Sequence, residues 1–189
     1  MRTPKQPRAA RRRESILDAA AALLESKGYE GVTTNALAKE ARASVGTVYQ
    51  YFPNKEAVLL ALLARYRERL AAALLPALEH EGLETAVEAL IRRFADFYVS
   101  EPGYAQLWLG TQLVGPLREA GAQWGEQFSH AFGEALAVRA GLHGDEARLK
   151  AKVLVHAVSS VISLAVSGDP QASELVDEAV ALALAYVRG

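Results

Sequence analysis

The chain has 189 residues, of which 51% are hydrophobic and 23% are charged, and it contains no cysteine. This composition is typical of one or two folded domains, and it excludes a disordered chain, a disulfide scaffold, a cysteine nucleophile and a thiolate metal site. The net charge of −1 is uneven, because residues 1–55 carry 10 Lys/Arg against 5 Asp/Glu, and the remainder carries 11 against 17. A basic N-terminal part indicates a polyanionic partner or a solvated basic tail.

Helical periodicity dominates the chain, and no segment alternates as a β-strand does. Glycines, prolines and capping residues predict nine helices. The first three lie at about 10–27, 34–41 and 44–52, a fourth begins at 54, and a fifth begins at 83. A short sixth helix lies between 103 and 115, a seventh ends at about 140, and the last two lie at 145–167 and 171–188. The longest apolar stretch, 153–166, has 14 residues with one histidine and three serines, short of the roughly 20 that span a bilayer. We expect an all-α, cytoplasmic protein of about nine helices, without membrane contact.

The two short helices at 34–41 and 44–52 have the proportions of a helix-turn-helix, whose second helix enters the major groove of DNA. In that second helix, Val48 and Phe52 are four residues apart and suit the hydrophobic anchor. Its other positions offer polar side chains or close backbone approach to DNA, namely Ser44, Val45, Gly46, Thr47, Gln50 and Tyr51. Lys55 begins the following helix, where a positive charge beside helix amides suits a phosphate.

Residues 33–38 (TTNALA) and 43–56 (ASVGTVYQYFPNKE) resemble the N-terminal signature of the TetR family of bacterial transcriptional regulators, with a close match from about Ser15 to Val58. The resemblance implies phosphate contacts by Thr34, Tyr49, Tyr51 and Lys55. It implies a groove-facing set, with Thr47 and Gln50 favoured as base readers, made of Ser44, Val45, Gly46, Thr47 and Gln50. From the residues alone, Tyr49 also suits packing, and Thr34 and Ser44 suit helix capping.

Two positions depart from the family pattern. Arg42 stands where a turn glycine is common, and Ala36 replaces the acidic residue that would complete a capping box with Thr33. Arg42 affects the geometry of the turn, and Ala36 predicts a slightly less stable helix at 34–41. Upstream, Arg11–Arg13 either begin a solvated helix or reach a flanking minor groove.

The last two helices each carry two apolar stripes, so each needs two partners. They fit a four-helix interface between two copies of the chain, or alternatively the core of a monomer. We assign the interface to one stripe of each helix, made of Leu154, Val158, Val161, Ala165, Val176, Val180, Ala183 and Val187. The companion stripes are Leu149, Val153, Ala157, Ser160 and Leu164 on the first of these helices and Leu175, Ala179, Leu182 and Tyr186 on the second.

Eight of the 14 aromatic residues fall within residues 94–132, interleaved with polar side chains. This pattern suits a mostly apolar ligand pocket, or equally a plain core. The predicted pocket comprises Phe94, Phe97, Tyr98, Trp108, Gln112, Trp124 and Phe128. The family resemblance favours a pocket for a small inducer, and the few arginines nearby favour an apolar or weakly polar compound over a polyanion.

The resemblance implies a DNA-binding domain at residues 1–53 and a helical ligand-binding and dimerisation domain at 54–189. It also implies a homodimeric repressor that binds a palindromic double-stranded DNA operator and releases it when a small, mostly apolar effector binds. The alternatives are an activator, or a regulator of the same fold that needs no ligand. The four histidines are scattered, and there is no phosphate loop or nucleophile elbow. We therefore expect no enzymatic activity, no cofactor and no metal.

Overall fold

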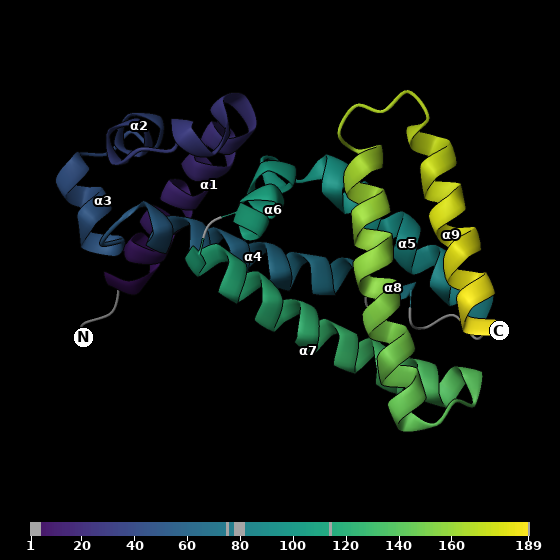
Figure 1. Cartoon of the computed structure of the whole chain (residues 1–189). Coiled ribbons are helices and arrows are strands. Elements are labelled where there is room, and N and C mark those ends of the chain that lie inside the picture. Colours follow the sequence, from purple (N-terminus) through teal and green to yellow (C-terminus); the bar gives the residue numbers. More distant parts are fainter. Residues whose placement is uncertain (1–4, 75, 78–81, 114, 189) are drawn as a thin grey trace. The chain divides into compact units, whose positions relative to one another are not determined.

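The computed structural model describes residues 5–74, 76–77, 82–113 and 115–188 (Figure 1). This part of the chain contains nine α-helices and no strand, which confirms the predicted all-α class. The helices are α1 (Lys5–Gly31), α2 (Thr34–Glu40), α3 (Val45–Tyr51), α4 (Lys55–Leu74), α5 (Leu83–Ser100), α6 (Tyr104–Leu113), α7 (Gly115–Ala140), α8 (Gly144–Ala165) and α9 (Ala172–Arg188).

The helices pack as two compact units. The first consists of the described residues of Met1–Glu68 and Glu101–Ala120, and the second of those of Arg69–Ser100 and Gly121–Gly189. The sequence placed a domain boundary between residues 53 and 54. The packing divides the chain differently, because most of α4 and all of α6 belong to the first unit, where α6 packs against α1.

Local capping sets the helix boundaries of the first unit. The Thr33 hydroxyl accepts a hydrogen bond from the Ala36 amide at 3.2 Å and begins α2. Ser44 caps α3 in the same way, and the Asn54 side chain accepts from the Ala57 amide at 2.8 Å at the start of α4. The predicted end of the first helix, Gly28, is a break within α1 at φ 66° and ψ −171°. These caps use residues close in sequence, and the sequence therefore predicts them well.

The turn between α2 and α3 has a left-handed residue at Arg42, with φ 49°. This is the position where the family pattern has a glycine, and a side chain in that conformation costs about 1–2 kcal/mol. The buried side chains of Leu37 and Val48 hold the two helices together on either side of the turn. The helix-turn-helix geometry is thus retained despite the arginine.

A glycine allows the turn before α6 to lie against α1. Gly103 has φ 71°, and a Cβ atom there would lie 2.5 Å from the Ala21 carbonyl oxygen and 2.8 Å from the Leu24 Cβ. Two side chains of α4 also hold the chain on either side of α6: the Tyr66 hydroxyl donates to the Pro102 carbonyl, and the Arg67 guanidinium donates to the Ala120 carbonyl. The segment around α6 is therefore part of the first unit's core.

In the second unit, α8 and α9 are antiparallel neighbours (Figure 1). The Lys150 ammonium near the start of α8 donates to the Tyr186 carbonyl near the end of α9 at 3.1 Å. Helix α5 packs against α9, and Arg92 bridges to Asp177 at 2.8 Å. The buried sides of α8 and α9 therefore face the interior of this unit.

Candidate nucleic-acid interface and effector pocket

Helix α3 is anchored on one side and open on the other. Val48 and Phe52 are buried, as their spacing predicted. Tyr49 is 55% exposed and Val45 37%, and Ser44, Gly46 and Gln50 are also exposed. A Cβ atom added at Gly46 would meet only the Ser44 hydroxyl, at 3.8 Å. The outward face of α3 thus lets another molecule approach the helix backbone closely.

Hydrogen bonds fix the start of α3. The Ser44 hydroxyl accepts from the Thr47 amide at 3.0 Å, and the two hydroxyl oxygens lie 2.8 Å apart. The half-buried Thr47 side chain is therefore held in place before any contact with DNA. Thr34 does not cap α2, since Thr33 does, and the Thr34 hydroxyl makes no hydrogen bond within the described part of the chain. The candidate phosphate contact of Thr34 does not compete with capping.

Lys55 has a structural role that the sequence did not show. Its ammonium donates to the Tyr29 carbonyl at 2.7 Å and lies 3.6 Å from the centroid of the Tyr29 ring. These contacts tie the start of α4 to the end of α1. Burial, together with the carboxylates of Glu56 and Glu30, raises the pKa of Tyr29, so its hydroxyl stays neutral. An ammonium has three donors, so a phosphate contact by Lys55 stays a prediction compatible with this bond.

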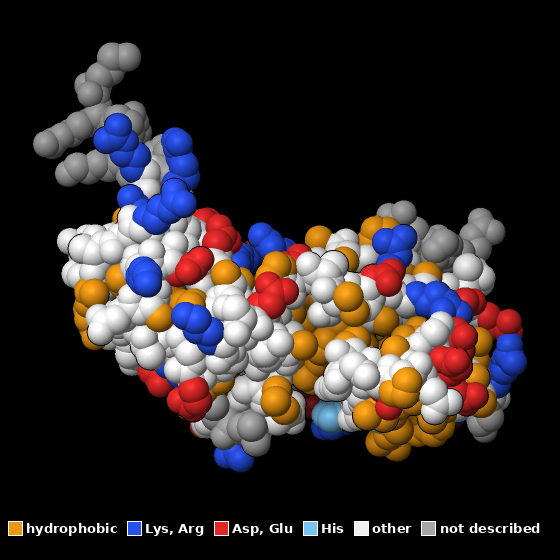
Figure 2. Space-filling view, turned by 90° about the horizontal axis from the view of Figure 1, so that it is seen from above, with side chains coloured by type: hydrophobic (Ala, Val, Ile, Leu, Met, Phe, Trp, Pro, Cys, Tyr) orange, Lys and Arg blue, Asp and Glu red, His pale blue; other side chains and the backbone are white. Residues whose placement is uncertain are grey.

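A basic groove adjoins α3 and joins two predicted DNA contacts, Thr47 and Tyr51, to arginines for which the sequence left a solvated helix start open as an alternative. It is lined by Arg8, Arg11 and Arg12 of α1 together with Thr47 and Tyr51 of α3. Figure 2 shows Lys and Arg side chains gathered at one end of the first unit. The sequence signal was the run of arginines, but only the packing of α1 beside α3 joins it to the candidate base-reading face. The groove has the charge and the hydroxyls that suit a DNA phosphate backbone.

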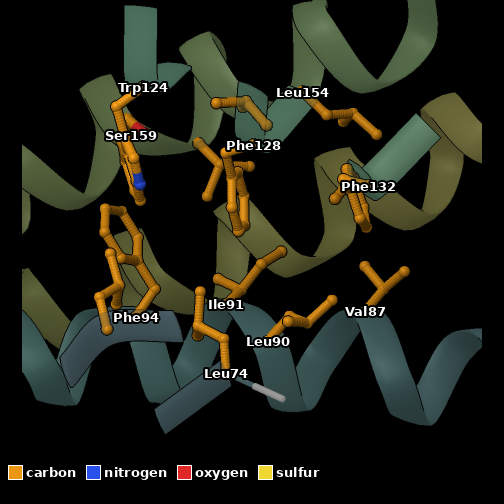
Figure 3. A pocket seen from close by; sticks show the side chains of 14 residues that line it. Leu74, Val87, Leu90, Ile91, Phe94, Trp124, Phe128, Phe132, Leu154 and Ser159 are labelled. Atoms are coloured by element: carbon orange, nitrogen blue, oxygen red, sulfur yellow. The ribbon is translucent and has the colours of Figure 1, made fainter. Parts of the chain in front are cut away.

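The second unit contains an apolar cavity of about 70 Å³ (Figure 3). Its lining consists of aromatic and aliphatic side chains and one hydroxyl: Leu70, Leu74, Val87, Leu90, Ile91, Phe94, Trp124, Phe128, Phe132, Leu154, Val155, Val158, Ser159 and Ala183. On α7 the rings stack in a column, with centroids 5.3 Å apart for Trp124 and Phe128 and 6.4 Å apart for Phe128 and Phe132. The lining has the apolar chemistry that is typical of ligand pockets.

The structure separates the predicted pocket residues into three groups. Phe94, Trp124 and Phe128 line this cavity. Phe97 and Tyr98 are buried on α5 without lining it. Trp108 and Gln112 lie on α6 and belong to the first unit. The sequence missed the contributions of α4, α8 and α9, because apolar residues in a helix look alike whether they face a cavity or a filled core.

The predicted dimer stripe is mostly covered by its own chain. Six of its members are buried: Leu154, Val158, Ala165, Val180, Ala183 and Val187, while Val161 and Val176 are half-buried. Leu154, Val158 and Ala183 also line the cavity. The exposed large apolar residues of the two helices are instead five members of the companion stripes, Leu149, Val153, Leu164, Leu182 and Tyr186, between 38% and 63% exposed, whereas Ala179 of the same stripes is buried. We call these five residues the outer stripe.

Known proteins resemble the chain in both parts. Residues 16–62 match a family model described as bacterial regulatory proteins of the tetR family, and residues 82–186 match one described as a tetracyclin repressor-like C-terminal domain. The HTH-type transcriptional repressor KstR of Rhodococcus jostii is 49% identical over 59 residues, which are 31% of this chain and 28% of that protein. The nucleoid occlusion factor SlmA of Glaesserella parasuis is 31% identical over 104 residues, 54% of this chain and 52% of that protein.

The similarity to solved structures extends along nearly the whole chain. A crystal structure of a TetR-family transcriptional regulator from Streptomyces coelicolor superposes with a TM-score of 0.73 at 25% identity, covering 93% of this chain and 97% of that one. The chain spans about half or less of the length of the two sequence relatives. Within the described ranges, no helix is both long and apolar enough to cross a membrane, and no three His, Asp or Glu side chains are grouped to hold a metal ion.

Proposed function

The chain belongs to the TetR family of bacterial transcriptional regulators, which are DNA-binding proteins and not enzymes, and from that membership we propose a ligand-controlled, homodimeric repressor. In this proposal it acts in the cytoplasm, binds a palindromic operator through α3, and leaves it when a small apolar molecule occupies the second unit. The observation that carries the proposal is the outward face of α3, which is open to close approach while Val48 and Phe52 anchor the other side.

The proposed DNA contacts divide into two kinds. Thr47 and Gln50 on α3 read base edges in the major groove, alongside Ser44, Val45 and Gly46. Thr34, Tyr49, Tyr51 and Lys55 bind phosphates, and the basic groove beside α3 adds Arg8, Arg11 and Arg12. The exposure of Tyr49 supports this assignment over a packing role.

The outer stripe supports the proposed homodimer. One helix of seven residues contacts too few bases to select a site, whereas two copies about 34–36 Å apart read a palindrome. Exposed apolar stripes on two neighbouring helices indicate a protein partner, and two such pairs form a four-helix interface. We therefore propose that α8 and α9 of two chains meet through Leu149, Val153, Leu164, Leu182 and Tyr186.

The apolar cavity supports control by a ligand. Leu70 and Leu74 at the end of α4 line it, while the start of the same helix is tied to α1 through Lys55. A ligand lowers DNA affinity only if it binds better to a conformation that does not bind DNA. KstR, which is 49% identical over 59 residues, is named an HTH-type transcriptional repressor, which supports repression over activation.

Selection of bound fragments from a random DNA pool tests the proposal. We expect enrichment of a near-palindrome and binding that weakens steeply as salt rises. Gln50→Ala should change the preferred sequence, whereas Tyr49→Phe should weaken binding to all sequences alike. A single asymmetric half-site, or equal losses on selected and random DNA for Gln50→Ala, would contradict the assigned contacts. DNA binding that raises transcription, or that no compound affects, would favour an activator or a ligand-independent regulator.

A further inference from the structure

The lining of the cavity in the second unit has no charge. Of its 14 residues none is acidic or basic, and the polar groups are the Ser159 hydroxyl and the Trp124 indole N–H. Two charged residues of the same helices, Glu126 of α7 and Lys152 of α8, pair with each other at 2.8 Å, and neither lines the cavity. The hydrogen bond from Lys152 lowers the pKa of Glu126, which keeps that carboxylate ionised and paired. A charged group placed against this lining would lose its hydration without gaining a partner.

The aromatic part of the lining extends along α7. Trp124, Phe128 and Phe132 follow each other at intervals of four residues, so they span about 12 Å of helix at 1.5 Å per residue. Their ring planes are within 20° of each other for the first pair and 13° for the second. Figure 3 shows Trp124 and Ser159 toward one end and Phe132 toward the other. A long, narrow apolar molecule can follow this column.

Ser159 offers a hydrogen bond at one end of the column. Two other helical serines satisfy their hydroxyls by donating to the carbonyl four residues earlier: Ser129 to Gly125 and Ser26 to Ala22, both at 2.7 Å. The Ser159 hydroxyl makes no such bond to any residue that the structure describes, and it lines the cavity. A hydroxyl in apolar surroundings gains most from a partner that enters with the ligand.

We propose that this cavity binds an uncharged, elongated hydrophobic molecule whose single hydroxyl or carbonyl group hydrogen-bonds to Ser159. The inference rests on the proposed function in that it assigns the chemistry of the effector. It excludes ligands that bring a carboxylate, phosphate or ammonium group into the cavity. An amphiphile with a charged head would leave that head in water and lose the contact with Ser159.

The size of the cavity indicates which wall moves. A cavity of about 150 Å³ admits benzene, and this one has about 70 Å³, so a longer molecule must displace side chains. The α5 wall is firmly packed, since Val87 and Ile91 are buried. Trp124, Phe128 and Phe132 of α7 are only half-buried. Ligand entry therefore displaces the aromatic column of α7.

The test compares probes of equal chain length and different head groups: octanol, octanoate, octylammonium and octyl bromide at neutral pH. Trp124 fluorescence in a Trp108→Phe background reports binding in the second unit. We expect octanol to bind at least tenfold more tightly than octanoate and octylammonium. Ser159→Ala should weaken octanol binding by about three- to tenfold and leave octyl bromide unchanged. Ser160→Ala, an exposed neighbour on α8, should change neither.

Three results would overturn the inference: octanoate binding as tightly as octanol, equal losses of octanol and octyl bromide in Ser159→Ala, or no binding of any probe. Circular dichroism shows whether Ser159→Ala folds. If it does not, the relative affinities of the four probes for the Trp108→Phe protein still test whether the cavity prefers an uncharged head group. A gel shift with selected DNA separates this inference from the proposed function. Octanol that binds without releasing DNA would contradict the effector role alone, and release by octanoate but not octanol would contradict the ligand chemistry alone.

Discussion

A pair of substitutions separates the outer stripe from the buried stripe of the C-terminal helices. Leu182 on α9 is 47% exposed in the single chain, whereas Val158 on α8 is 8% exposed and lines the cavity. Both are apolar positions that sequence periodicity allows at a dimer interface. We predict that Leu182→Glu dissociates the dimer and leaves each chain folded, whereas Val158→Glu unfolds the second unit.

The expected magnitudes follow from burial. A fully buried leucine contributes about 1.5–3 kcal/mol, so covering the exposed half of Leu182 contributes about 1 kcal/mol per copy and about 2 kcal/mol in a symmetric pair. Its loss raises the dimer Kd at least about 30-fold, since each 1.4 kcal/mol is about tenfold. At Val158 an unpaired carboxylate would be buried inside the chain, which costs several kcal/mol out of a total stability of about 5–15 kcal/mol.

Sedimentation velocity and thermal unfolding distinguish the two outcomes. Leu182→Glu should sediment as a monomer at concentrations where the unsubstituted protein is a dimer, with its helical content retained. Val158→Glu should lose helical content or unfold at a much lower temperature. Val138→Glu, at an 85% exposed position of α7 outside the outer stripe, should alter neither measurement. An unchanged mass for Leu182→Glu, or a well-folded monomer for Val158→Glu, would refute the assignment of the two stripes.

Three further variants test the first unit. Arg8→Gln with Arg11→Gln should reduce the slope of log affinity against log salt by about 2, because each phosphate contact contributes about 0.9. Arg42→Gly should raise the free energy of unfolding by about 0.5–1 kcal/mol, because glycine adopts φ 49° without the steric cost and loses only part of that gain to its own flexibility. Gly103→Ala should lower it by about 2 kcal/mol or more, because the methyl group would meet the Ala21 carbonyl at 2.5 Å.

Each of these predictions has a matched control. Arg148→Gln, an exposed arginine on α8, should leave the salt slope unchanged, and an equal change would mean that net charge alone sets the slope. Arg42→Lys keeps the side chain in the left-handed conformation and should not stabilise the protein. Gly125→Ala, inside α7 with no atom within 4 Å of the added methyl group, should stabilise the chain by about 0.5–1 kcal/mol. Chemical denaturation measures the free energy of unfolding of the Arg42 and Gly103 variants and of their two controls.

Local sequence was sufficient to predict the helix boundaries and the buried anchor residues of α3. Caps and breaks act over three or four residues, so Ser44, Asn54 and Gly28 could be recognised without knowledge of the fold. The anchor spacing of Val48 and Phe52 has the same local origin. The position of Arg42 in a strained turn also followed from a comparison with the family pattern and agrees with its positive φ.

The pocket and the interaction surfaces depended on contacts between distant residues. Trp108 and Gln112 lie between Phe94 and Trp124 in sequence, yet their helix packs against α1, because Gly103 allows that approach. Lys55 meets Tyr29, and the arginines at the start of α1 lie beside Thr47, through packing that no local pattern encodes.

The amino-acid sequence by itself determined where the helices begin and end, which short helix is anchored on one side by Val48 and Phe52 and open on the other, and that the last two helices are apolar on two sides. Only the tertiary structure decided which of those two sides is inside. Periodicity shows that a helix face avoids water, and it does not show what covers that face. Here α5 packs against α9 and α9 against α8, so Val158 and Val180 are covered within the chain while Leu164 and Leu182 remain exposed to meet another surface.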